Sequence, residues 1–171
     1  MPLKFLHKEK IRKKMENLKN LIKGNILFKD LGNEYIDFLT QNASLIEYSS
    51  EQFLFFARDQ ADYFYLILEG KVAVQMFSHE KGEIIIEEIK SGELLGWSWL
   101  KKPYKWKFDA ITLKKTKLIA FDAEVIRNKM ESNNEFGYKI QSIFMSLVIE
   151  RLYATRLRLL KELGDNIYIP D

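Results

Sequence analysis

Hydrophobic positions recur at helical spacing near both ends of the chain and at strand spacing between them. Close to the N-terminus, apolar residues three or four positions apart predict an amphipathic helix over about residues 9–23 that ends near Gly24. A second short helix is expected from Asn33. The period then changes to two, and short turns separate seven β-rich runs: residues 45–48, 53–56, 63–68, 72–77, 84–89, 107–113 and 117–121.

The helical pattern returns after Asp122, which is positioned to cap a short helix over residues 123–131. From Glu135 to about Leu163 the chain has no Pro, which predicts a helix of about 43 Å. Its apolar residues cover more than one stripe, so we expect one face to pack on the strands and another to contact the same helix of a second copy. A helix that only covers a monomeric core is the alternative. The residues expected at the homodimer interface are Ile140, Ile143, Phe144, Leu147, Val148, Leu152 and Leu159.

These elements predict a mainly β protein with flanking helices. The expected fold is an antiparallel β-roll or jelly roll followed by a long C-terminal dimerisation helix. The length of 171 residues fits one ordinary domain with its own core. We expect four parts: a basic N-terminal helical arm (1–29), the β-roll sensor domain (30–134), the long helix (135–163) and a tail (164–171).

Composition removes several classes of function. The chain has no Cys and only two His, which excludes thiolate chemistry and argues against a multi-His metal site or a Ser-His-Asp triad. We therefore assign no catalytic residue, metal or cofactor and expect a protein that is not an enzyme. No apolar run reaches the roughly 18 residues of a membrane-spanning helix. The N-terminus also lacks the apolar segment of a secretory signal, so a cytoplasmic protein is expected.

The net charge of +3 conceals an uneven distribution. Residues 1–29 hold nine Lys and Arg against two Glu, a net of +7, whereas the rest of the chain carries a net of −4. A basic amphipathic helix can bind an anionic membrane. This one has no Trp and its basic residues are spread around it, so we expect it to pack or dock on protein and not on a membrane.

Three stretches occur in a characteristic order. Residues 53–74 contain an apolar strand that ends at Glu69-Gly70, residues 92–96 read Gly-Glu-Leu-Leu-Gly, and residues 150–156 read Glu-Arg-Leu-Tyr-Ala-Thr-Arg. Together they resemble the sensor domain of the Crp/Fnr-type regulators, the cyclic nucleotide-binding β-roll, over roughly residues 28–163. The resemblance implies that these stretches are the opening hairpins, the start of the phosphate-binding cassette and the ligand-facing part of the long helix.

The cassette departs from the pattern that the resemblance implies. In nucleotide-binding members a short helix follows the second Gly, a Glu binds the ribose, an Arg pairs with the phosphate, and a hydroxyl residue follows that Arg. Here those three side chains are matched by Trp97, Phe108 and Asp109. Strand alternation would place Lys105 and Lys107 on the face opposite Phe108. We therefore expect no binding of cAMP or cGMP.

Aromatic residues replace the missing polar groups. All three Trp lie between residues 97 and 106, in a Gly-Trp-Ser-Trp-Leu motif and a Trp-Lys-Phe-Asp-Ala motif that resemble a divergent subgroup of stand-alone bacterial Crp-like domains. The rings either wall a site for a non-nucleotide small molecule or fill the vacated pocket as core. The candidate pocket residues are Gly92, Glu93, Leu94, Leu95, Gly96, Trp97, Ser98, Trp99, Trp106, Phe108, Asp109, Ala110, Arg151, Thr155 and Arg156.

Two functions follow from these alternatives. The first is a dimeric regulatory domain that senses a small molecule, and the second is a dimeric adaptor with a filled pocket that binds a protein partner. An open cavity beside Trp97 and Phe108 would favour sensing. The family's transcription factors carry a helix-turn-helix module after the long helix, and the eight residues that follow Leu163 leave no room for one, so we expect no direct DNA binding.

Overall fold

The computed structural model describes residues 3–162 and, from residue 9 onward, their side chains. The expected tail, residues 164–171, and Leu163 lie outside the described residues. Eight strands form two four-stranded antiparallel sheets, in the orders β1-β8-β3-β6 and β2-β7-β4-β5. The strands are β1 (Ala43–Tyr48), β2 (Phe53–Phe55), β3 (Tyr63–Glu69), β4 (Lys71–Ser78), β5 (Gly82–Lys90), β6 (Leu94–Leu95), β7 (Asp109–Thr112) and β8 (Thr116–Asp122).

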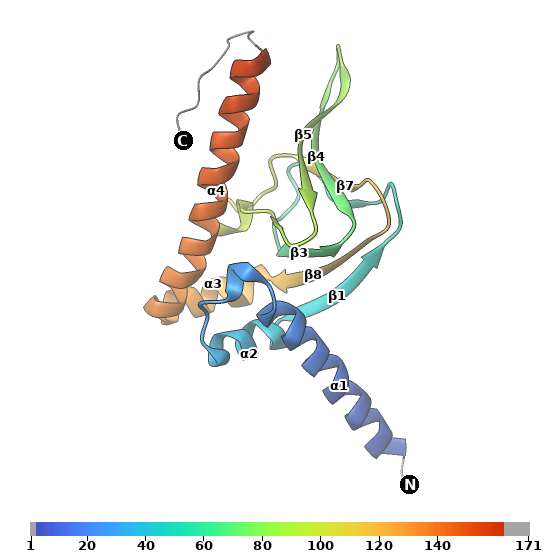
Figure 1. Cartoon of the computed structure of the whole chain (residues 1–171), viewed down its shortest axis with the longest axis vertical. Coiled ribbons are helices and arrows are strands. Elements are labelled where there is room, and N and C mark those ends of the chain that lie inside the picture. Colours follow the sequence, from blue (N-terminus) through green and yellow to red (C-terminus); the bar gives the residue numbers. More distant parts are fainter. Residues whose placement is uncertain (1–2, 163–171) are drawn as a thin grey trace.

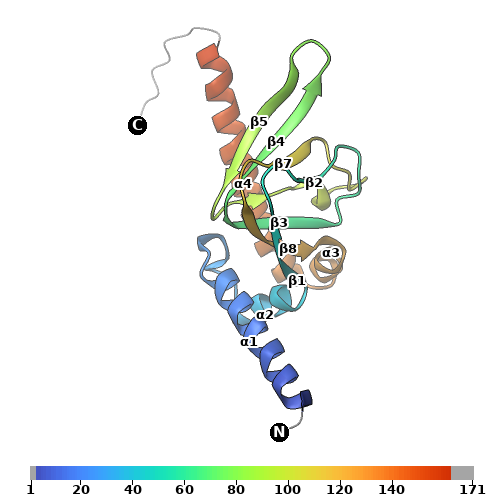
Figure 2. The ribbon, with the colours of Figure 1, turned by 90° about the vertical axis from the view of Figure 1, so that its right-hand side faces the viewer.

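Helices cover one side of this β-roll. They are α1 (Leu3–Lys23), α2 (Asn33–Gln41), α3 (Ala123–Ser132) and α4 (Asn134–Glu162), with short 3₁₀ turns at Ile26–Phe28 and Ser98–Leu100. Helices α2 and α3 lie against the sheet that contains β1, β8 and β3, α1 packs on α2, and α4 runs alongside the roll (Figures 1 and 2). Because β3 packs on the other sheet and also on helices, its residues Phe64–Ile67 are buried on both faces.

The mainly β fold with flanking helices is confirmed, and its strands lie where the alternation predicted them. The two-residue strand β6 was missed because two apolar residues are too short a run to show a period. The β7 strand begins at Asp109 and not at residue 107, since the chain from 105 to 108 forms only one isolated bridge, between Lys105 and Gln60.

Among the described side chains of the N-terminal helix, from residue 9 onward, the buried ones lie at its C-terminal end. Leu18 and Ile22 are buried, whereas Ile11 is half exposed. The helix begins at Leu3, six residues before the predicted start, and its N-terminal part extends away from the roll (Figure 1). Within the described part of the chain, no helix combines the length and apolar character needed to cross a membrane.

The first half of α4 belongs to the core of its own chain. Phe136, Ile140 and Phe144 are at most 1% exposed and Leu147 is 8% exposed. Three residues that the sequence placed at the dimer interface, Ile140, Phe144 and Leu147, therefore cannot contact a second copy, because the roll already covers them. This is a correction: the apolar stripe chosen from sequence merged the core-facing and exposed faces of one helix.

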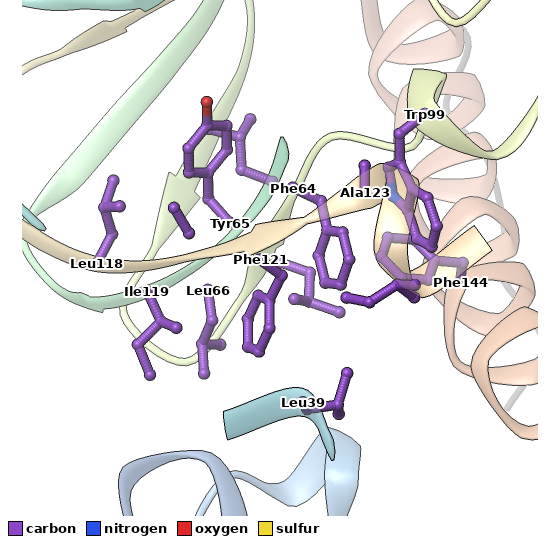
Figure 3. Close-up of a cluster of buried hydrophobic side chains, with 14 of the residues drawn as sticks. Leu39, Phe64, Tyr65, Leu66, Trp99, Leu118, Ile119, Phe121, Ala123 and Phe144 are labelled. Atoms are coloured by element: carbon purple, nitrogen blue, oxygen red, sulfur yellow. The ribbon is translucent and has the colours of Figure 1, made fainter. Parts of the chain in front are cut away.

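Trp99 lies at the junction of α4 and the roll. Its ring stacks on Phe64 at 4.6 Å between centroids and meets the edge of Phe144 at 5.2 Å (Figure 3). Its carbonyl accepts a hydrogen bond from Arg127 Nη1 at 3.0 Å. The indole Nε1 is buried and has no hydrogen-bond partner among the described residues. Trp99 is therefore a core residue and not part of a pocket.

The burial of Trp99 leads to a stability prediction. Trp99→Ala removes a ring with 0% exposure, so we expect a loss of about 3–5 kcal/mol in the free energy of unfolding. Trp97→Ala, at a position 37% exposed, should cost about 1 kcal/mol. Urea denaturation followed by far-UV circular dichroism measures both. Equal losses for the two variants would contradict the assignment of Trp99 to the core.

Candidate functional site

A cavity of about 340 Å³ lies between the β-roll and α4. Strands β2, β4, β5 and β6 supply part of its wall, the two irregular segments around Trp97 and Trp106 supply another part, and α4 supplies the rest. The lining is mostly apolar. Its residues are Phe55, Val74, Ile86, Glu87, Leu95, Gly96, Trp97, Ser98, Trp106, Lys107, Phe108, Val148, Arg151, Leu152 and Thr155.

The structure brings together about half of the residues predicted for the pocket. Those that line the cavity are Leu95, Gly96, Trp97, Ser98, Trp106, Phe108, Arg151 and Thr155. The others do not line it: Gly92, Glu93, Leu94, Trp99, Asp109, Ala110 and Arg156.

Local structure explains where these other residues lie. Gly92 and Glu93 form the turn into β6, where the Glu93 carboxylate accepts a hydrogen bond from the Lys90 backbone N–H. Asp109 accepts one from the Ala57 backbone N–H at 2.7 Å. Leu94 and Ala110 are buried in strands, and Arg156 is exposed on α4. Asp109 and Glu93 therefore hold loops in place.

Sequence reasoning missed Phe55, Val74, Ile86, Glu87 and Lys107. The first three are ordinary strand residues, and no pattern separates a residue that lines a cavity from one that fills a core. Lys107 was expected on the far face of a strand, yet residues 105–108 are not a regular strand and Lys107 borders the cavity. Val148 and Leu152, chosen as interface residues, also line it.

Stacked aromatic rings form one wall of the cavity. Phe55 and Trp106 lie nearly parallel, with 3.8 Å between ring centroids and 11° between planes. Trp106 is held against Gly96, which has a φ of 91°. A Cβ built on Gly96 would lie 2.5 Å from the Trp106 ring, so only glycine allows this close approach.

One ion pair provides the strongest polar feature of the cavity. Arg151 Nε lies 2.7 Å from Glu87 Oε1, and the two side chains are 13% and 28% exposed. Arg151 Nη2 also donates to the Leu94 carbonyl at 2.5 Å, and its guanidinium lies 5.1 Å from the Trp97 ring centroid. Burial raises the pKa of Glu87, which Arg151 opposes, and burial lowers the pKa of Arg151, which Glu87 opposes. The pair joins α4 to β5 and β6.

Two further features describe the chemistry of the site. Among the described residues, no three His, Asp or Glu side chains gather closely enough to hold a metal ion. The segment that follows Gly96 contains a 3₁₀ helix of only three residues, Ser98–Leu100, with Trp97 before it. The described site thus offers aromatic surface, two hydroxyl residues, the Arg151–Glu87 ion pair and the exposed Lys107 at its border.

Comparison with known proteins places this geometry in a family. The sequence model of the cyclic nucleotide-binding domain matches residues 45–133, which is more than half of the chain and includes both sheets. The chain belongs to the cyclic nucleotide-binding domain family. Domains of this family are generally regulatory and not catalytic. No curated protein matches the chain significantly in sequence.

Solved structures show the same fold. A cyclic nucleotide-binding domain from Methylobacillus flagellatus has a TM-score of 0.73 at 21% identity, covering 91% of this chain and 88% of that one. The N-terminal domain of a transcriptional regulator from Streptomyces coelicolor has a TM-score of 0.61 at 24% identity, covering 82% and 95%. The sensor domain of the regulator DNR from Pseudomonas aeruginosa has a TM-score of 0.61 at 15% identity, covering 93% and 99%. At these identities the likeness concerns the fold.

The contact between Gly96 and Trp106 leads to a matched prediction. Gly96→Ala adds a Cβ that meets the ring, whereas Gly92→Ala, at a nearly equal φ of 89°, meets nothing within 4 Å. Both variants carry the cost of a left-handed alanine, about 1–2 kcal/mol. We expect Gly96→Ala to lose about 1–3 kcal/mol more and to shift tryptophan emission, because Trp106 must move. Urea denaturation and fluorescence test this, and equal losses would contradict it.

Proposed function

We propose that the protein is a dimeric regulatory domain that binds a non-nucleotide small molecule in the cavity between the β-roll and α4. The cavity itself carries the proposal, because it is open beside Trp97 and Phe108 where the adaptor alternative requires a filled pocket. Its volume of about 340 Å³ falls in the range of about 300–1,000 Å³ typical of small-molecule sites. Trp99 is buried, which is what the adaptor alternative expects of all these rings, but Trp97 is 37% exposed.

Cyclic nucleotides do not suit this site. No carboxylate follows Gly96, since Trp97 occupies that position, and Phe108 stands where the resemblance expects the phosphate-binding Arg. Arg151 is already paired with Glu87 and with the Leu94 carbonyl. A bound phosphate would need a cation to pair with, and Arg151 is already engaged by these contacts. An unpaired buried anion is costly in free energy.

The exposed face of α4 supports a homodimer. Tyr138, Met145, Ile149, Leu152 and Leu159 are each at least half exposed and lie seven, four, three and seven positions apart. This is the heptad spacing of a helix that pairs with another helix, and it extends over about 32 Å. We call these five residues the α4 stripe. A second copy of the same helix presents a matching stripe, which makes a symmetric pair the natural occupant.

The absence of cyclic nucleotide binding is directly testable. We expect isothermal titration calorimetry with cAMP or cGMP to show no saturable binding below about 50 μM, because losing one charge-assisted pair costs about 2–5 kcal/mol of a micromolar affinity near −8 kcal/mol. The double variant Trp97→Glu, Phe108→Arg restores two of the three missing groups and keeps the Asp109 hydrogen bond. Measurable binding by this variant alone supports the proposal, whereas tight binding by the wild type would refute it.

The dimer has a separate test. In sedimentation velocity at micromolar concentration, we expect about twice the monomer mass of 20.3 kDa. Ile149→Glu places a charge in the α4 stripe and should raise the dimer dissociation constant at least about 100-fold, since a buried unpaired charge is heavily penalised. Glu150→Lys changes the charge of an exposed neighbour outside the stripe and serves as the control. A wild-type monomer, or equal effects of both variants, would rule out this interface.

A further inference from the structure

The cavity combines an aromatic lining with one ion pair and one exposed lysine. Phe55 and Trp106 stack on each other at 3.8 Å and Trp106 is 5% exposed, so these two rings are held firmly in place where they border the cavity. Trp97 and Phe108 add aromatic surface to the lining. Rings of this kind bind planar aromatic molecules by offset or edge-to-face contacts.

The ion pair at the cavity removes the usual reason for binding an anion. Arg151 Nε lies 2.7 Å from Glu87 Oε1 and Nη2–H donates to the Leu94 carbonyl, so the charge of Arg151 is paired with a carboxylate that also lines the cavity. An anionic ligand would meet the Glu87 charge as well as that of Arg151. Lys107 also borders the cavity, but its side chain is exposed and remains hydrated.

Hydrogen-bonding groups are nevertheless present on the lining. Ser98 and Thr155, which each carry a hydroxyl, both line the cavity, as does Arg151 with its N–H groups. A neutral group such as a carboxamide can donate to and accept from these without separating the ion pair. Breaking that pair would leave a partly buried charge without its partner.

We propose that the cavity takes a neutral, planar aromatic molecule of about two fused rings with one hydrogen-bonding group, and that it rejects the corresponding anions. This inference rests on the proposed function, because it names the ligand class of the same site. The volume of about 340 Å³ sets the size, the aromatic side chains of the lining favour a flat aromatic molecule, and the Arg151–Glu87 pair sets the charge.

The test uses two probes that share one ring system and differ in charge. 2-Naphthamide is neutral and 2-naphthoate is an anion at pH 7. Each is titrated into the full chain by isothermal titration calorimetry, and the side-chain N–H signals of the three Trp are followed by NMR to locate binding. We expect 2-naphthamide to bind at least tenfold more tightly than 2-naphthoate and to shift the signals of Trp97 and Trp106 more than that of Trp99.

Glu87→Gln tests the role of charge. It leaves Arg151 without its counter-charge, so the ratio of the two affinities should move at least tenfold toward 2-naphthoate. Glu83→Gln makes the same change at an exposed position on β5 that does not line the cavity, and the ratio should stay at the wild-type value. In the double variant Glu87→Gln, Arg151→Gln both charges are absent, and preference for the amide should return.

The outcomes distinguish a wrong ligand class from the absence of a ligand site. If the wild type prefers 2-naphthoate, the neutral ligand class is wrong while the ligand site stands, and Lys107→Gln then shows whether Lys107 supplies the cation. If the wild type binds neither probe but Glu87→Gln binds 2-naphthoate, the cavity is accessible and only the ligand class fails. If no variant binds either probe, the inference fails together with the ligand-binding part of the proposed function.

Discussion

The packing of the first half of α4 into the aromatic core determines the geometry around the cavity. Phe144 meets both Phe64 and Trp99 edge-on, and Phe136 lies against Tyr35 and Phe38 of α2. These contacts fix the direction of the helix, so that its next turns reach the mouth of the roll. The cavity is thus a consequence of a helix that is anchored at one end and longer than the core it covers.

The Arg151–Glu87 pair then holds the helix beside the roll where apolar contact becomes sparse. Its energetic value is modest, because desolvation offsets much of the attraction between two partly buried charges. Its structural value is greater, because one guanidinium links α4 to β5 through a carboxylate and to β6 through a backbone carbonyl. A well-packed apolar pair could hold the helix as firmly but would not set the polarity of the cavity.

Sequence periodicity predicted the architecture well and the site only in part. Strand alternation, helical periodicity and the cap at Asp122 predicted the elements because these are local properties. The pocket depends on which strand residues face a space and which fill it, and this is set by packing between distant segments. Thus Trp97 and Trp99, two positions apart and chemically identical, lie in the cavity wall and the core respectively. No sequence pattern indicated that Glu87 lines the site, since its ion-pair partner Arg151 is 64 positions away.

The three Trp residues form a graded series of solvent contact within ten residues of chain. Trp97 is 37% exposed, Trp106 5% and Trp99 0%. Hydrogen exchange at an indole N–H requires water to reach it, so the three protons sample openings of increasing extent. These exposures predict the fastest exchange at Trp97 and the slowest at Trp99, whose Nε1 is buried. Hydrogen exchange at these three indole protons would therefore report how far water enters the domain when its structure fluctuates.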